Sequence, residues 1–314
     1  MHALVLSLSL AAATSSVVPD ALAPPEPIAD TPREPRYGFA ALPLLDYTSA
    51  FGMGFGVRGS MQRYADGRKP YQYGLTLQAY GSTSGIRRHL FRADVPGVLG
   101  SELRAKFAVM YERNLAATYF GIGHHAQIEP RASLRRYYYD DESPDARALV
   151  SYPIFGAVSV AALYQVRQTR IGVPAGSLLA TERPRGIEGG RYSSFTGGLI
   201  HDTRDFESNP TDGSLIEVSA RISHRGLGSD YEVAGAFVSA ARYLGLTRKL
   251  VLAGRAAIDR MWGDVPFNHL GDLGSLDVIH ESGIGGNDTV RGLLHNELLA
   301  RGKAVLNAEL RYRL

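Results

Sequence analysis

The chain has 314 residues, a formal net charge of +3, 45% hydrophobic residues and no cysteine. That length allows one large domain or two small ones, and the lack of cysteine excludes thiol chemistry and disulfide bonds. The charges are nearly balanced and form no Lys/Arg tract, so nucleic acid is not an expected partner. Seventeen tyrosines and 35 glycines favour strands joined by tight turns.

The N-terminal stretch has the features of an export signal. The apolar run from Ala3 to Ala13 has the length of a signal-peptide core, and Ala21-Leu22-Ala23 fits a small-residue cleavage site. Five prolines follow between residues 24 and 36, which predicts an extended linker. We expect a signal peptide over 1–23, a linker over 24–36 and one folded domain over 37–314. Beyond the N-terminus no apolar run reaches the roughly 18 residues of a membrane-spanning helix.

The rest of the chain alternates apolar and polar residues in the manner of strands. Phe51, Met53, Phe55 and Val57 share one face, and glycines occupy the other. No helix pattern follows this Gly-x-Gly run, so a phosphate-binding loop is not expected. Further alternating runs begin near Tyr71, Leu103, Val158, Phe195, Gly213, Tyr231, Leu250 and Gly302.

The polar face of several runs is charged. Arg104 and Lys106 oppose Phe107 and Val109, and Glu217 and Arg221 lie on the face opposite four apolar residues. In a soluble sandwich the apolar face would pack in the core and the charged face would meet water. In a membrane barrel the apolar face would meet lipid and the charged face would line a polar lumen.

Strand and loop lengths favour the membrane barrel. The run from Val158 to about Ile171 exceeds the usual strand length and suits a tilted crossing of about 9–11 residues. Long polar loops are expected over 113–145, 172–190 and 263–296, and short turns between them. His124 and His125 lie in the first loop with no further ligand at metal spacing, so no metal or cofactor is expected. The sequence therefore predicts an all-β chain forming a transmembrane antiparallel β-barrel of about 12 strands, an even number as in closed single-chain bacterial barrels.

A glycine-bracketed stretch, Gly285-Gly286-Asn-Asp-Thr-Val290-Arg291-Gly292-Leu293, lies in the third long loop. Glycines on both sides allow the backbone to fold back and to aim Arg291 in one direction. A guanidinium offers a rigid fork of donors that suits a carboxylate. We predict a loop tucked into the barrel and held by Arg291 to an acid on the wall. The alternative is a surface loop with a solvated arginine.

Two segments carry a family resemblance. The stretch from Gly285 to Leu293 resembles the Val-Arg-Gly-aromatic loop of the superfamily of barrel-assembly factors and two-partner-secretion transporters, the bacterial surface antigens. Asp202-Thr-Arg204-Asp205, with Pro210 and Gly213, is similar to a turn of the same barrels. The resemblance implies a bacterial outer-membrane location. It also implies that Arg291 pairs with Glu309 inside the barrel, with Asp202, Arg204 and Asp205 bracing the loop.

The chain's end fits this resemblance. Leu306, Ala308, Leu310, Tyr312 and Leu314 share one face of the final run, similar to the terminal targeting signal of outer-membrane barrels. The family's usual barrel has sixteen strands and carries periplasmic repeat domains that dock substrates. Twelve strands with a proline-rich stretch in place of those domains are expected here, or sixteen strands if the chain is truncated.

Three functions are compatible with such a barrel. The resemblance implies a non-enzymatic role in inserting or transporting membrane proteins or lipids. Outer-membrane lipids and unfolded or secreted proteins are then the expected partners, and no pattern indicates an oligomeric state. An outer-membrane lipid deacylase or phospholipase is the second; His201 and His224 are available to it, but no recognisable constellation surrounds them. A passive pore is the third, although an infolded Arg291 loop would fill part of its lumen.

Overall fold

The computed structural model describes residues 3–6, 36–48, 52–65, 70–123, 133–207, 209–276 and 297–312, and these are almost wholly β. The only α-helix among them is the five-residue α1 (Leu178–Glu182). No helix in these residues has the length and apolar character needed to span a bilayer. The strands are β1 (Ala3–Leu6), β2 (Arg36–Thr48), β3 (Gly52–Tyr64), β4 (Tyr73–Ser82), β5 (Arg87–Val95), β6 (Arg104–Thr118), β7 (Tyr138–Phe155), β8 (Val158–Gly172), β9 (Gly190–Asp202), β10 (Gly213–Ser223), β11 (Val233–Gly245), β12 (Leu250–Gly263) and β13 (Gly302–Tyr312).

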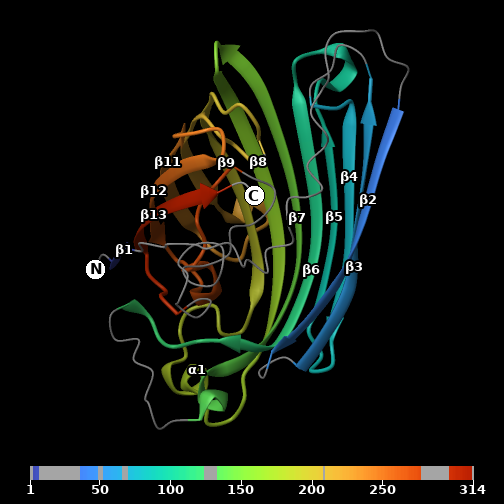
Figure 1. Ribbon diagram of the computed structural model, residues 1–314. Coiled ribbons are helices and arrows are strands. Elements are labelled where there is room, and N and C mark those ends of the chain that lie inside the picture. The colour runs from blue at the N-terminus through green and yellow to red at the C-terminus, as the bar shows by residue number, and fades with distance from the viewer. Residues whose placement is uncertain are drawn as a thin grey trace.

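These strands form one sheet in which β2 to β13 follow each other in chain order, each antiparallel to the next. β1 pairs in parallel with β13, with Ala3 opposite Lys303. The sheet curls around an interior, so that β2 to β5 face β11 to β13 across it (Figure 1). Among the described residues no backbone pairing joins β2 to β13.

The two faces of the sheet have opposite chemistry. On β10, Ile216, Val218 and Ile222 are 40–52% exposed on the outer face, whereas Glu217 and Ser219 are buried on the inner face. β12 repeats the pattern, with Ile258 62% exposed and Asp259 fully buried. An apolar outer band over a polar, charged interior is the pattern of a membrane barrel. The predicted fold, twelve antiparallel strands of transmembrane type, is confirmed.

The two ends of the barrel differ. At one end, which we call the short-turn end, the connections cover 65–72, 96–103, 156–157, 203–212 and 246–249. The long-loop end carries 119–137, 173–189 and 264–301. The predicted loop 172–190 matches the boundary between β8 and β9. In outer-membrane barrels the long loops face the cell exterior and the short turns the periplasm.

The loop predicted over 113–145 is shorter in the structure than the sequence indicated. β6 continues to Thr118 and β7 begins at Tyr138, so Asp141, Glu142 and Asp145 lie within a strand. The polar composition of this stretch suggested a loop, but a polar lumen accepts acidic side chains on the inner face of a strand. There the carboxylate of Asp145 pairs with Arg147, with Nη2 and Oδ2 2.9 Å apart.

Candidate functional site

The connection after β12 runs into the barrel and forms the candidate site. We call residues 264–276 the lumenal segment. It enters through a 3-10 turn at Phe267–His269, where the Phe267 ring is 1% exposed. That ring packs edge-on against Tyr119 and Tyr139, each with centroids 5.4 Å away. The Phe267 N–H donates to the carbonyl of Arg185 at 2.8 Å. Aromatic packing at the long-loop end thus fixes where the segment enters.

A buried charge cluster on β10, β12 and β13 holds the middle of the lumenal segment. The Asp259 carboxylate, fully buried, accepts from Arg221 Nη1 at 2.8 Å and from Nη2 at 2.9 Å. Lys303 Nζ lies 3.3 Å from Asp259 and donates to the carbonyls of Leu270 and Asp272 at 2.9 and 2.5 Å. The Gly274 N–H donates to the same carboxylate at 3.0 Å. One anion therefore links two wall cations to the backbone of the segment.

Glycines make room for this arrangement. A Cβ at Gly274 would overlap the guanidinium of Arg221, and a Cβ at Gly235 on β11 would lie 2.7 Å from Arg221 Nε. Arg221 therefore lies between two positions that have no side chain. The close approach lets the guanidinium meet Asp259 in a bidentate pair, the strongest geometry for such ions.

The end of the lumenal segment is bound to the wall at two places. Glu217 accepts from the Leu276 N–H at 2.5 Å and from the Ser275 hydroxyl at 3.0 Å. The Leu276 side chain packs with buried residues of the nearby strands, namely Ala108 of β6, Leu149 of β7, and Ala161 and Leu163 of β8. The segment is thus bound to β10 by charge and to β6–β8 by apolar contact.

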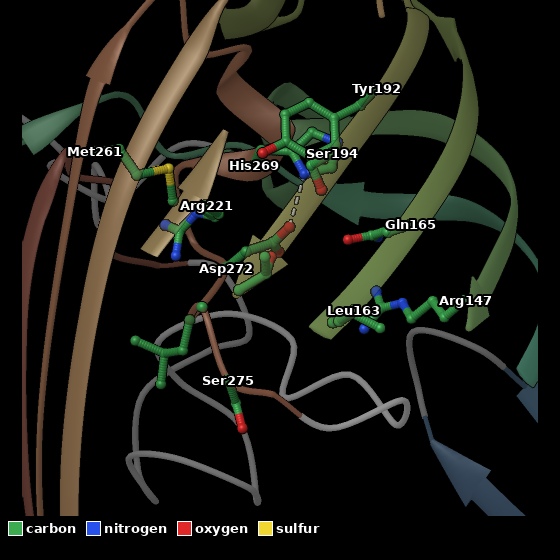
Figure 2. Close-up of a pocket in the computed structure, with 13 residues that line it drawn as sticks. Arg147, Leu163, Gln165, Tyr192, Ser194, Arg221, Met261, His269, Asp272 and Ser275 are labelled. Carbon is green, nitrogen blue, oxygen red and sulfur yellow. Dashed lines mark hydrogen bonds and ion pairs between the residues drawn. The ribbon is translucent and has the colours of Figure 1, made fainter. Parts of the chain in front are cut away.

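A small pocket lies beside the segment, between β7–β10 and β12 (Figure 2). His269 Nδ1 and Asp272 Oδ2 are 2.8 Å apart, and the His269 ring stacks on Tyr192 with centroids 4.1 Å apart. Arg167 approaches Asp272 to 4.0 Å. Arg147 and Gln165 line the far side of the pocket, and both bond Asp145. The pocket is part of the contact between segment and wall.

The predicted Asp-x-Arg-Asp turn lies at the short-turn end, between β9 and β10. Arg204 donates to Asp202 through Nε and Nη2 at 2.9 and 2.7 Å. The Asp205 carboxylate accepts from the backbone N–H groups of Phe206, Thr211 and Asp212 at 3.0, 2.8 and 3.2 Å. Partial burial opposes ionisation of Asp205, but a hydrogen bond from the Thr211 hydroxyl, together with these backbone bonds, outweighs it and lowers the pKa of Asp205. The three predicted residues close their own turn.

The same turn reaches β6 through Glu207. Arg104 at the start of β6 donates to Glu207 Oε1 at 2.6 Å and Oε2 at 3.1 Å, and also binds Asp94 of β5 through two bonds. β7 and β8 lie between β6 and β9 in the sheet, so the turn extends across the short-turn end. Burial works against ionisation of Glu207, but the Arg104 hydrogen bonds and charge lower its pKa.

We expect Glu207→Gln to release this turn, because the neutral amide loses the charge-assisted bonds to Arg104. Protease cleavage within 203–212 of the reconstituted chain should rise severalfold, with a loss of about 1 kcal/mol for a partly exposed pair. Glu188→Gln, at an exposed pair with Arg183 in the β8–β9 loop, is the matched control. Equal cleavage of the turn in wild type and Glu207→Gln would contradict the contact.

The loop motif of Gly285, Gly286, Val290, Arg291, Gly292 and Leu293 lies outside the described residues. Its predicted partner, Glu309 on β13, pairs with Arg311, with Nε and Oε2 3.0 Å apart.

The two histidines considered for an enzyme, His201 and His224, lie far apart. His201 is opposite Ile216 near the start of β10, whereas His224 directly follows the end of β10, eight residues after Ile216. Glu217, Gly274, Asp259 and Lys303 were not predicted as site residues, although Glu217 belongs to the polar face that the alternation identified.

Fold and site together define a class: a transmembrane antiparallel β-barrel with a connection folded into its lumen. Residues 72–314 match the family model described as the Omp85 superfamily domain, and the chain belongs to that superfamily. This confirms the resemblance that the two motifs predicted, and with it a location in the bacterial outer membrane. No curated protein matches the chain.

Solved structures support the fold. Sixty-four chains match, among them the crystal structure of BamA from Haemophilus ducreyi lacking POTRA domains 1–3, with a TM-score of 0.52 and 14% sequence identity. The alignment covers 83% of this chain and 46% of that one, so this chain spans about half the length of that protein. At this low sequence identity, the similarity supports the barrel fold alone.

Proposed function

We propose that this barrel acts in the insertion or translocation of proteins or lipids at the outer membrane, with the third long loop as its internal moving part. Membership of the Omp85 superfamily and the likeness to BamA support the class of activity. The single observation that carries the proposal is the binding of the lumenal segment by Glu217, Asp259 and Lys303. The segment occupies the lumen, where polar contacts with β10, β12 and β13 hold it together with the apolar contacts of Phe267 and Leu276.

The mechanism rests on how the loop continues past Leu276. Arg291 pairs with a carboxylate of the wall, Glu309 in the family pattern, and so holds the rest of the loop inside the barrel. The partners are outer-membrane lipids and unfolded or secreted proteins, and the role is non-enzymatic. A lumen occupied by residues 264–276 argues against a passive pore, since a pore needs an open path.

Arg291→Ala tests the proposed ion pair between Arg291 and the wall. We expect larger conductance in planar bilayers, because the loop loses its ionic anchor to the wall. The rate at which vesicles carrying the variant fold an unfolded outer-membrane barrel should fall severalfold. Deleting 285–293 should raise conductance at least as much, and Arg248→Ala, in the exposed β11–β12 turn, serves as control. Unchanged conductance and folding rate with Arg291→Ala would argue against this ion pair, and hydrolysis of phospholipid by the pure chain would favour an enzyme.

A further inference from the structure

A row of directly opposed charged residues crosses the outer face of β5 to β8 near the long-loop end. Arg87 of β5 faces Arg113 of β6, Arg113 faces Glu142 of β7, and Glu142 faces Arg170 of β8. We call these four residues the arginine row. Alternation places them outside, because Phe91 and Phe107, on the same faces of β5 and β6, are 36% and 42% exposed. This row serves neither the lumenal segment nor the short-turn contacts.

The pairing of Arg87 with Arg113 is unfavourable on its own. Like charges directly opposite on neighbouring strands destabilise a sheet, since their Cβ atoms lie about 4.5–5.5 Å apart. Neither residue forms an ion pair with any residue that the structure describes. Glu142 is engaged elsewhere: it accepts from Arg170 at 3.3 Å and from the Tyr111 hydroxyl at 3.3 Å. Three cations and one anion leave a net charge of about +2, which an external anion would compensate.

The row lies at the height of lipid headgroups. Below the row the outer face of the four strands is apolar apart from His89 and Gln168, as at Phe91, Val109, Ala148 and Val166. About twelve residues separate Glu142 from Ile154 on β7, and at about 3.3 Å per residue with a tilt of about 40° they span roughly 30 Å, the thickness of the hydrocarbon core. His89 and Tyr111 stack one step below the row, with centroids 5.9 Å apart, where interfacial aromatics belong.

There is also space for a ligand. Gly81 of β4 lies opposite Arg87 on its other side and places no side chain next to the guanidinium. The Arg170 side chain is 71% exposed. Guanidinium groups bind phosphate oxygens through two parallel bonds, and two adjacent ones can share a single phosphate.

We infer that the arginine row binds the phosphate of an anionic lipid in the leaflet that faces the long loops. Arg87 and Arg113 hold the phosphate between them, Arg170 adds a third donor group, and the acyl chains lie along the apolar strands below. Bound phosphate removes the repulsion between the two arginines. The site depends on the orientation of the barrel in the membrane and is independent of what the lumen transports.

Native mass spectrometry of the full chain in zwitterionic detergent tests the site, with bisphosphorylated lipid A as the probe. We expect retained lipid A, a loss of occupancy of about tenfold or more in the Arg87→Gln/Arg113→Gln double variant, and unchanged occupancy in Arg260→Gln. Arg260 is an outward arginine of β12 with Ala236 and Gly302 opposite it, so it lacks a second arginine. Equal retention by wild type and the double variant would overturn the site.

Two further arms separate the sources of the anion and guard against misfolding. Lipid A stripped of both phosphates should not be retained, and inorganic phosphate at equal concentration should not displace lipid A. Retention of the stripped lipid, or displacement by inorganic phosphate, would overturn the assignment to the phosphate of an anionic lipid. Arg87→Glu should replace repulsion with attraction toward Arg113. We expect this variant to resist heat better than wild type in lipid-free detergent and yet to lose lipid A. Unchanged lipid retention in this folded variant would refute the inference.

Discussion

Replacing Asp259 with asparagine should destabilise the folded barrel by about 3–5 kcal/mol, the cost of leaving buried cations without their anion. Asp259 is fully buried, and Lys303 is 2% exposed. The substitution removes the negative charge from Arg221, from Lys303 and from the Gly274 N–H at once. The measurement is the urea midpoint of unfolding in lipid vesicles, followed by the heat-dependent shift in gel mobility.

The control for Asp259→Asn is the same change at an exposed pair. Asp212 lies 3.5 Å from Arg242, and both side chains are more than half exposed. Asp212→Asn should change stability by less than about 1 kcal/mol. Adding Lys303→Gln to Asp259→Asn should cost less than the sum of the single changes, because the two ions share one network. Strict additivity, or a midpoint equal to that of wild type, would show that the cluster does not act as a unit.

Alternation was enough to predict the wall of the barrel. The faces of β10 and β12 follow from the order of residues such as Glu217, Val218 and Asp259, since strand side chains alternate with a period of two. β7 was partly missed because the stretch containing Asp141, Pro144 and Asp145 has the composition of a loop. Asp141 and Asp145 are tolerated because they face a polar interior, where Arg147 pairs with Asp145. Glu142 lies on the outer face instead, where it pairs with Arg170.

The contacts of the lumenal segment depend on information that one sequence does not contain. Asp259 meets Arg221 only because β10, β11 and β12 pair in a particular register and Gly235 leaves space between them. The motif around Arg291 lies in the same connection, outside the described residues, and the described anchors lie earlier in it, at Gly274 and Leu276. Their signal is local: a glycine followed by Ser275 and an apolar residue, which is common in ordinary turns.

A single methyl group at Gly274 should dislodge the lumenal segment. The Cβ of Gly274→Ala would overlap Arg221 Nη1 and lie 3.1 Å from Asp259 Oδ2. The guanidinium has little freedom to withdraw, because Gly235 bounds its other side and Asp259 binds it twice. Either Arg221 leaves Asp259 or the segment moves away from β10 and loses the Gly274 N–H bond. Overpacking of this kind costs about 1–3 kcal/mol.

If the segment moves away from β10 the lumen opens, whereas if Arg221 leaves Asp259 the segment stays in place, and conductance distinguishes these two outcomes. We expect Gly274→Ala to open larger and longer-lived currents in planar bilayers, because Arg221 is fixed to the wall by two bonds to Asp259, whereas the segment makes one bond to that carboxylate, from the Gly274 N–H. Gly254→Ala is the control: Gly254 lies on the outer face of β12, and its added Cβ would meet only the Asn307 carbonyl, 4.0 Å away. Its currents should match those of wild type. A Gly274→Ala barrel that is less stable but conducts like wild type would mean that Arg221 withdrew and that the segment stays in the lumen without the Asp259 contact.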